Sequence, residues 1–224
     1  MYQAYRGSHD VWNENFSPVD VTQLNGYIFF RSKALLLSPG VTFTRLNNYV
    51  YFDEDPTRQQ HVYPQQSTGS QVITSPELRF TLTFLRHVTL GGQAIYTSLL
   101  ENANNAISVP DLFVNGQLAY QNIFFNGNLD MQAGFDVHWQ SDYTALNYDP
   151  VIQQFYLQYP QGAFQSKAFP IVDVFLNAKI KRGRIFVKYT NLVQAFTGEG
   201  YFPTPYYPGQ SNVIDFGFDW SFYD

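Results

Sequence analysis

The sequence predicts an all-β fold, an antiparallel meander whose strands form a transmembrane β-barrel. Apolar and polar residues alternate with a period of two along most of the 224 residues, and the periodicity of a helix is nearly absent. Short turns and long polar loops alternate between the resulting segments. Most segments have about ten residues, the length of a tilted strand that crosses a bilayer, whereas strands in soluble proteins average roughly five or six.

The alternating segments predict about nine strands along the chain. The first two, over 27–37 and 42–52, alternate less cleanly than the others, and the segment 91–100 is ambiguous. The remaining segments are 77–85, 111–125, 128–140, 171–180, 184–193 and a last one that starts at 213.

Short turns are predicted where the alternation breaks for two or three residues. The Asn-Gly and Arg-Gly pairs at two of these sites are signals for tight hairpins. The sites are 38–40, 86–87, 126–127 and 181–183. The longer polar connections are 53–76, 101–110, 141–170 and 195–211. All short turns then lie on one rim and all long loops on the other, as in outer-membrane barrels.

Two architectures fit antiparallel strands with this pattern, and the polar face distinguishes them. A soluble sandwich or barrel buries the apolar face, whereas an outer-membrane barrel presents it to lipid and lines its lumen with the polar side chains. Both architectures exclude charge from the apolar face. The polar face here is rich in Gln, Asn, Asp and Gly rather than in the Lys and Glu of a soluble surface, which favours the membrane barrel.

The alternation assigns each strand residue to one of two faces. The residues that we predict to line the lumen are Arg79, Asp130, Gln132, Asp136, His138, Asp173, Asn177, Lys179 and Lys188. The residues that we predict to face lipid are Phe80, Leu129, Phe135, Val137, Val174, Leu176, Phe218 and Trp220. The charges of the whole polar face have both signs, so we expect no strong ion preference. They are Arg31, Lys33, Arg79, Lys179, Arg184 and Lys188 against Glu77, Asp111, Asp130, Asp136, Asp173, Asp215 and Asp219.

The composition excludes several classes of protein. Aromatic residues make up 18% of the chain and charged residues only 14%, whereas charged residues form roughly 25% of an ordinary soluble domain. Disordered chains are poor in aromatic residues, so disorder is not expected. The net charge of −5 argues against a nucleic-acid partner. The chain has no Cys, which excludes thiolate metal sites, iron–sulfur clusters and thiol nucleophiles.

Aromatic residues gather near the ends of the predicted strands, where rings with a polar handle suit the headgroup region. They include Tyr51, Phe52, Phe124, Phe125, Trp139, Tyr143, Phe222 and Tyr223. The last strand carries an aromatic alternation of Phe216, Phe218, Trp220 and Phe222. We interpret these four as an assembly signal, because an unpaired last strand offers backbone groups with which the barrel-assembly machinery can pair. The alternative is that this strand only closes the sheet.

No catalytic or metal-binding constellation is predicted. Asp136 and His138 lie two residues apart on the polar face, a pairing that some proteases use to activate water. The sequence offers no second carboxylate pair of matching spacing, so we interpret both residues as lumen lining. The acidic run of Asp53, Glu54 and Asp55 lacks the spacing of a calcium loop and is expected to be solvated. We therefore expect no enzyme, no cofactor and no metal.

The loop over 197–211 combines four aromatic residues with three prolines. They are Tyr201, Phe202, Tyr206 and Tyr207, among Pro203, Pro205 and Pro208. The prolines stiffen the loop. Its rings could stack on a sugar, pack over the mouth of a pore or pack against one another.

The strand count predicts a piece of a larger barrel. The chain starts without a signal peptide. If the last strand ends on the short-turn side, the first strand starts from the long-loop side, and 1–21 is expected to be an outer loop. Single-chain bacterial barrels have even strand numbers, so we expect upstream strands and a signal peptide to be missing. A hairpin over 151–159 would add two strands and leave this parity unchanged.

Several segments near the C-terminus together resemble a known family. The motif GFDVHW at 134–139 leads into YTALNYDP at 143–150 and FYLQ at 155–158, and PIVDVFLNAKIKR at 170–182 precedes RIFVKYTNL at 184–192. This combination resembles the C-terminal region of the putative porin family of Bacteroidota outer membranes, which is similar in turn to the barrel strands of TonB-dependent receptors. The resemblance covers mainly 130–224 and implies a barrel in the outer membrane of a Gram-negative bacterium. Because the solutes of the family are largely undefined, it assigns no binding residue. Family members are longer than this chain and begin with signal peptides.

The predicted function is a porin-like channel for the passive diffusion of small solutes. Its expected partners are outer-membrane lipid and lipopolysaccharide, the barrel-assembly machinery and a small solute of unknown identity. One alternative is a non-transporting barrel that serves as a scaffold or partner in a surface or transport complex. Another is the barrel part of a TonB-dependent receptor.

Overall fold

The computed structural model describes residues 3–7, 11–55, 61–158 and 162–222. Its strands are β1 (Ala4–Arg6), β2 (Val11–Asn13), β3 (Asp20–Tyr27), β4 (Phe30–Arg31), β5 (Leu35–Asn47), β6 (Val50–Glu54), β7 (Val62–Gln66), β8 (Gln71–Phe84), β9 (Val88–Tyr96), β10 (Ser98–Asn102), β11 (Leu112–Phe124), β12 (Leu129–Gln140), β13 (Tyr143–Thr144), β14 (Asn147–Asp149), β15 (Gln154–Tyr156), β16 (Gln165–Ser166), β17 (Ile171–Ile180), β18 (Gly183–Tyr189) and β19 (Ile214–Trp220). The helices are α1 (Leu192–Thr197) and two 3-10 turns, η1 (Ala103–Asn105) and η2 (Phe125–Gly127). None of the helices described is long and apolar enough to cross a membrane.

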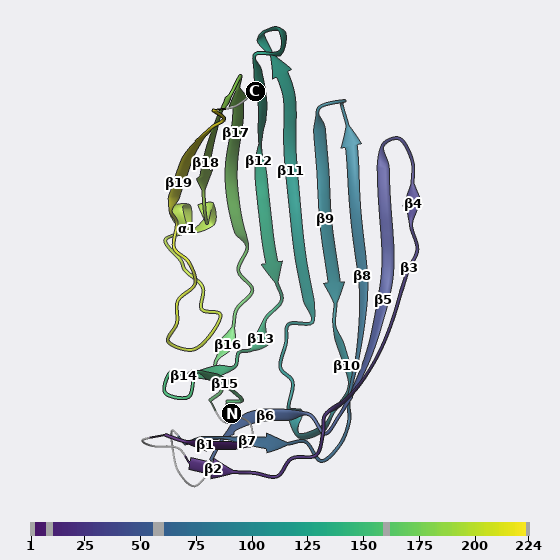
Figure 1. Cartoon of the computed structure of the whole chain (residues 1–224), viewed down its shortest axis with the longest axis vertical. Coiled ribbons are helices and arrows are strands. Elements are labelled where there is room, and N and C mark those ends of the chain that lie inside the picture. Colours follow the sequence, from purple (N-terminus) through teal and green to yellow (C-terminus); the bar gives the residue numbers. More distant parts are fainter. Residues whose placement is uncertain (1–2, 8–10, 56–60, 159–161, 223–224) are drawn as a thin grey trace.

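The long strands form one curved antiparallel sheet (Figure 1). Its order is β19-β18-β17-β12-β11-β9-β8-β5-β3, with β10 added to β8 and β4 added to β5. This order is a meander of nine principal strands, which confirms the predicted fold class. Within the described part of the chain, β3 and β19 each pair on one side only, so the sheet is open at both edges.

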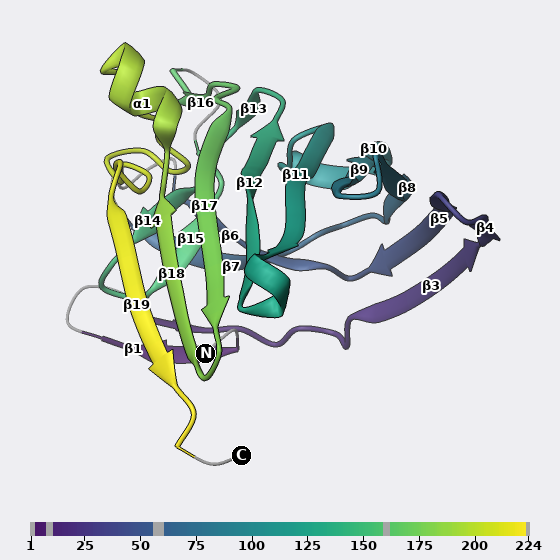
Figure 2. The ribbon, with the colours of Figure 1, turned by 90° about the horizontal axis from the view of Figure 1, so that it is seen from above.

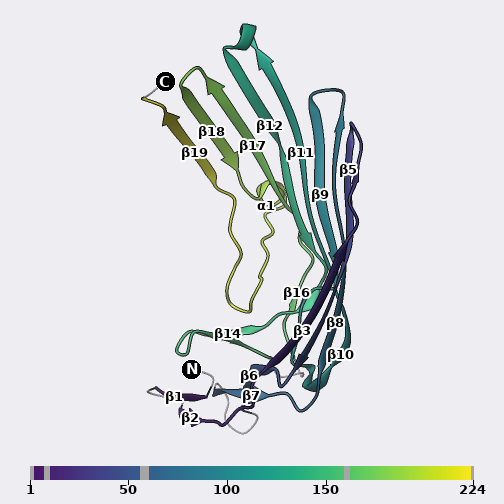
Figure 3. The ribbon, with the colours of Figure 1, turned by 45° about the vertical axis from the view of Figure 1, so that its right-hand side comes forward.

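Short hairpins join the strands at one end of the sheet and long loops join them at the other (Figures 1 and 3). The turns predicted at 86–87, 126–127 and 181–183 are present. Their backbones use positive φ angles, at Arg86 (60°), Asn126 (55°) and Lys181 (53°), as tight hairpin turns require. Because β19 runs towards the hairpin end (Figure 1), the last strand has the predicted direction.

One predicted turn is wrong. Residues 38–40 lie inside β5, and the chain turns instead at 32–35, where Ser32 N donates to Leu35 O at 2.8 Å. The carbonyl of Pro39 accepts a hydrogen bond from Ile28 N at 2.9 Å. The N and C=O groups of one strand residue point to the same side of the strand. The nitrogen of Pro39 therefore faces the short gap between β3, which ends at Tyr27, and β4, which begins at Phe30. A proline without an N–H is tolerated there, and the first predicted strand is replaced by β3 and β4.

The register of the sheet separates two faces, because directly opposite residues on paired strands share a face. Asp136 lies opposite Gln117 on β11 and Asp173 on β17. Phe135, the next residue, lies opposite Leu118 and Val174. Followed across all nine principal strands, this register yields one polar face and one apolar face. On the apolar face of the described strands the only charges are Asp20, Arg45 and Glu101, all near the loop end.

The polar face lines the concave side of the sheet. Figure 2 shows the sheet as an arc seen from above, with β6, β7, β14 and β15 within its concave side. The hollows of this surface are lined mainly by residues of the polar face, such as Gln132, Asp136 and Asn177. The apolar face is therefore convex and exposed, with Phe135, for example, 44% accessible.

The main cluster of buried hydrophobic residues lies in the long loops. The predicted strand 42–52 is divided by a turn at Asn48, so Tyr51 and Phe52 belong to β6. They were expected in an aromatic girdle at a strand end, but burial leaves them 7% and 4% accessible. Phe52 packs in a cluster with Trp12, Val62, Ile152 and Tyr156. The predicted girdle residue Tyr223 lies outside the described residues.

We call the hairpins that contribute to this core the loop cap, consisting of β1 with β2, β6 with β7, and β14 with β15. The three hairpins come from separate loops, and side chains of each pack together. Backbone contacts also join two of them, since Leu157 N donates to Phe52 O at 3.0 Å. The loop cap therefore lies across the loop end of the concave side as one packed unit (Figures 2 and 3).

Candidate functional site on the polar face of the sheet

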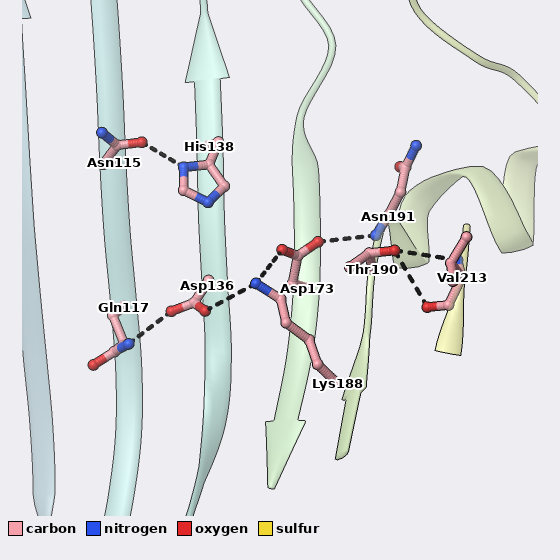
Figure 4. Close-up of polar contacts among 9 residues, drawn as sticks. All are labelled: Asn115, Gln117, Asp136, His138, Asp173, Lys188, Thr190, Asn191 and Val213. Atoms are coloured by element: carbon pink, nitrogen blue, oxygen red, sulfur yellow. Dashed lines mark hydrogen bonds and ion pairs between the residues drawn. The ribbon is translucent and has the colours of Figure 1, made fainter. Parts of the chain in front are cut away.

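A lysine links two carboxylates that stand on neighbouring strands of the polar face (Figure 4). Lys188 Nζ on β18 lies 2.8 Å from Asp173 Oδ2 on β17 and 3.7 Å from Asp136 Oδ2 on β12. Gln117 Nε2 on β11 donates to the other oxygen of Asp136 at 2.7 Å. Four strands thus contribute to one polar network.

The local chain geometry fixes Asp173. Its other oxygen, Oδ1, accepts a hydrogen bond from the backbone N of Asn191 at 2.9 Å. Asn191 has a positive φ of 52° and caps helix α1, because its side chain accepts a hydrogen bond from Gln194 N. Thr190 joins β18 to the chain before β19, since Thr190 N donates to Val213 O at 2.9 Å. The end of β18 therefore holds the carboxylate of Asp173 in place.

The ion pairs of this network are partly shielded from water. The side chain of Asp173 is 8% accessible, that of Asp136 is 22% and that of Lys188 is 37%. A carboxylate that is this buried needs a partner, because burial of an unpaired charge is costly. Two carboxylates and one ammonium leave a net charge of −1 on this part of the wall.

A second polar network lies nearer the open β3 edge. Glu77 on β8 contacts Arg79 in an ion pair and accepts a hydrogen bond from Gln93 Nε2 at 2.9 Å. Tyr27 OH on β3 donates to Glu77 at 3.4 Å, and the guanidinium of Arg79 lies 5.9 Å from the centre of the Tyr27 ring. The predicted lumen residue Arg79 thus belongs to a network of side chains from three strands, β3, β8 and β9.

Two rows of residues, all polar except Phe186, each cross four strands at the hairpin end of the polar face. In the first row, Asp130, Lys179, Arg184 and Asp219 lie opposite one another on β12, β17, β18 and β19. In the second row, Gln121, Gln132, Asn177 and Phe186 lie opposite one another on β11, β12, β17 and β18. Together these rows line a groove of about 530 Å³.

Two aromatic rings on the polar face lie against glycines of the neighbouring strand. Phe186 lies opposite Gly217, and Phe175 lies opposite Gly134. A Cβ atom added to Gly217 would overlap the ring of Phe186, and one added to Gly134 would meet the ring of Phe175. Because glycine has no side chain, each ring can pack against the backbone of the neighbouring strand.

All nine residues predicted to line the lumen lie on the polar face, and all eight predicted lipid-facing residues lie on the apolar face. The first group is Arg79, Asp130, Gln132, Asp136, His138, Asp173, Asn177, Lys179 and Lys188. The second is Phe80, Leu129, Phe135, Val137, Val174, Leu176, Phe218 and Trp220. That the polar face meets water and the apolar face meets lipid stays a prediction.

The structure directs Asp136 and His138 to different partners. His138 Nδ1 lies 2.5 Å from Asn115 Oδ1, whereas Asp136 contacts Gln117 and Lys188. The acidic run at 53–55 is part of the loop cap, and burial raises the pKa of Asp53. Among the residues that the structure describes, no group of three or more His, Asp or Glu side chains could hold a metal ion.

The aromatic residues of the loop 197–211 pack mainly against rings of the loop 141–170. Tyr207 meets Tyr148 edge-on at 5.5 Å, and Tyr201 stacks on Phe169 at 5.4 Å between ring centres. Phe202 meets Phe164 at 6.3 Å. Tyr206 is the exception, with 89% of its surface accessible.

The sequence reasoning missed two groups of residues. Asn115 and Gln117 lie on the polar face of a predicted strand, so the alternation alone could have indicated them. Asn191 was not singled out, because its role depends on a hydrogen bond to a residue 18 positions away. No local signal indicates such a contact.

Comparisons with known proteins agree with this architecture. The chain is similar to the structure titled "Copper transporter OprC", with a TM-score of 0.71 and 13% identity over 93% of this chain and 32% of that one. It is also similar to the FrpB iron transporter from Neisseria meningitidis, with a TM-score of 0.63 and 13% identity over 92% of this chain and 32% of that one. A third similar structure is the ferripyoverdine receptor of the outer membrane of Pseudomonas aeruginosa, with a TM-score of 0.64 and 12% identity over 93% of this chain and 28% of that one. The chain thus spans about a third of the length of these structures.

No curated protein sequence matches the chain. A family model described as "Putative porin" matches residues 1–224, the whole of it. Together with the meander of long strands, this match places the chain in the outer membrane of a Gram-negative bacterium. The chain belongs to the putative porin family.

Proposed function

We propose that the complete protein forms a channel for the passive diffusion of small solutes across the outer membrane. The observation that carries the proposal is the continuous polar face, which crosses all nine principal strands on the concave side. Side chains of both signs and many amides cover it, and the rings of Phe175 and Phe186 pack against glycines. Such a wall suits a water-filled passage for polar solutes.

The rest of the barrel is part of this proposal. Strands outside the described sheet would pair with β3 and β19 and close the lumen, because open sheet edges do not occur in the hydrocarbon layer. The segment 1–21 would be an outer loop, with β3 starting at Asp20 near its end. We also propose a Bacteroidota origin and no enzymatic activity, both supported by the motifs that resemble the porin family.

Conductance measurements on the complete protein test the channel. The protein, extracted from outer membranes, is inserted into planar lipid bilayers, and single-channel currents are recorded in KCl. Stable conductance steps with weak preference between K⁺ and Cl⁻ support a passive channel. A correctly folded barrel that inserts and carries no current contradicts it.

Two observations favour specific alternatives. The loop cap covers the loop end of the concave side, as a non-transporting scaffold barrel would permit. The similar solved structures are titled as metal transporters and a receptor, which favours the barrel part of a TonB-dependent receptor. A scaffold would stay silent in the bilayer, and a receptor would need energy coupling for uptake.

We propose that the last strand also serves as an assembly signal. Phe216, Phe218, Trp220 and Phe222 remain highly exposed at an edge that offers free backbone groups. Replacement of Phe218 and Trp220 by Asp should leave the chain unassembled and reduce its crosslinking to the barrel-assembly machinery. If the variant chain crosslinks as well as the intact chain, the strand only closes the sheet.

A further inference from the structure

We propose that the groove at the hairpin end of the polar face binds a neutral carbohydrate, with the ring of Phe186 as its stacking platform. The groove holds about 530 Å³, within the range of roughly 300–1,000 Å³ that small-molecule sites occupy. This inference rests on the proposed channel function, whose solute it names by chemical class.

The first observation is the orientation of Phe186. Its ring lies over Gly217, and the side chain lines the groove. One face of the ring therefore contacts the wall and the other is available to the groove. Phe186 remains 47% accessible, although it stands on the polar face between charged and amide side chains. The C–H faces of a pyranose ring stack on such an exposed aromatic face.

The second observation is the charge pattern of the row that borders Phe186. Asp130, Lys179, Arg184 and Asp219 follow one another across four strands with the signs −, +, + and −. Their net charge is zero, so the row offers no net attraction to an ion. A neutral solute fits this balance better than an anion, which the two carboxylates would repel.

The third observation is the supply of hydrogen-bonding groups without partners. Within the described ranges, the side chains of Lys179, Arg184 and Asp219 take part in no hydrogen bond or ion pair. Asp130 accepts a single hydrogen bond, from Gln121 Nε2 at 3.3 Å. Lys and Arg only donate and Asp only accepts hydrogen bonds, whereas an amide does both.

Sugar hydroxyls match this inventory, since each hydroxyl can donate and accept. Asn177 lies next to Phe186 in the second row and Gln132 lies beyond it, so planar amides extend from one side of the ring. A carbohydrate lying on Phe186 could thus reach carboxylates, cations and amides along its edges. The combination of an exposed ring face, planar polar groups and zero net charge is what assigns the class of ligand.

The test uses the complete protein in detergent, with radiolabelled maltohexaose as the probe and equilibrium dialysis as the readout. We expect saturable binding that changes little between low and high salt, because the ligand is neutral. Phe186→Leu should weaken the binding about tenfold, since it removes an aromatic stacking surface. The control Phe135→Leu, on the apolar face of β12, should bind like the wild type.

Several results would overturn the inference. Folded wild-type protein that does not bind maltohexaose at roughly 10 mM contradicts the carbohydrate class. Equal affinity of the wild type and Phe186→Leu contradicts the groove as the site. Tighter, salt-sensitive binding of succinate would show an anion site instead. Sugar binding is measured in detergent, so its result is independent of the conductance test. Sugar binding without conductance refutes the channel function alone. Conductance without sugar binding refutes only the assignment of the groove as a carbohydrate site.

Discussion

Lys188 on β18 contacts Asp173 on the neighbouring strand β17, although the strand register does not place the two residues opposite each other. Their charged atoms are 2.8 Å apart, whereas the residue opposite Lys188 on β17 is Phe175. The ring of Phe175 packs against Gly134, and the long lysine side chain passes diagonally to the buried carboxylate. This contact joins β18 to β17 and, through Asp136, to β12.

Removal of this ammonium should destabilise the sheet. Lys188→Met leaves the buried Asp173 with only its backbone partner Asn191. We expect the free energy of unfolding to fall by roughly 1–3 kcal/mol, the cost of leaving a buried polar group without a partner, with partial exposure of Lys188 limiting the loss. Urea unfolding of the complete protein in lipid vesicles measures the change.

A double-mutant cycle supplies the control. In Lys188→Met combined with Asp173→Asn, the uncompensated charge is gone, so the double variant should be more stable than Lys188→Met alone. If the two substitutions act additively, Lys188 does not stabilise Asp173.

Gly217 should be intolerant of a side chain because of Phe186. In Gly217→Ala the new Cβ would overlap the ring of Phe186, so the ring must move off the wall. We expect a loss of about 1–3 kcal/mol in unfolding free energy, as for other overpacked sites. The matched control is Gly91→Ala on the same polar face, where the nearest atom lies 3.8 Å from the added Cβ. Equal stability of the two variants would disprove the role of Gly217.

Acid should stabilise the loop cap. Burial raises the pKa of Asp53 above its ordinary value of 3.8. The carboxyl group of Asp53 therefore holds its proton more tightly in the folded cap than in the open loop. The cap gains stability as the pH falls through this raised pKa, and the gain is complete below 3.8. Hydrogen exchange of the β6 and β7 amides, corrected for the intrinsic pH dependence, measures cap opening.

The variant Asp53→Asn removes this titration. At pH 7 its β6 and β7 amides should exchange more slowly than those of the wild type, because no buried charge opposes closure. Below the raised pKa the two proteins should exchange at similar rates. Faster exchange in Asp53→Asn at pH 7 would show that the carboxylate stabilises the cap.

The two faces of β12 should respond differently to a new charge. Phe135→Arg places a charge against lipid near the middle of the strand, at a cost of roughly 2–4 kcal/mol at the bilayer midplane. Gln132→Arg places the same charge on the polar face and should be tolerated. The amount of folded barrel in the membrane fraction, judged by gel mobility before and after heating, compares them. Equal damage from both would refute the face assignment.

The sequence predicts the sheet better than the loops, for physical reasons. A period of two determines which face a residue occupies wherever one face must be apolar, and β12 and β17 match their predicted segments closely. Pro39 is a local turn signal that tertiary context overrides, because the gap between β3 and β4 tolerates a missing N–H. The loop cap could not be foreseen, since Phe52, Ile152 and Trp12 come from three separate loops and meet only in the folded chain.

The site shows the same division. Alternation places Asp136, Asp173 and Lys188 on one face, but it does not indicate that the three charges form one network. That network depends on the stagger between β12, β17 and β18 and on the end of β18 at Thr190 and Asn191. Pairing of Phe186 with Gly217 likewise requires the register of β18 and β19.

The most direct test of a water-filled lumen behind the polar face is cysteine accessibility along β12. The chain has no native Cys, so single substitutions at 130–133 and 135–137 each add one thiol to this part of the barrel in the intact outer membrane, and the unsubstituted protein gives the background labelling. We predict that a charged, membrane-impermeant thiol reagent modifies the even positions, such as Gln132→Cys and Asp136→Cys, and reduces the conductance. The odd positions, such as Phe135→Cys and Val137→Cys, should stay unmodified. Uniform modification, or modification of the odd positions only, would contradict the account.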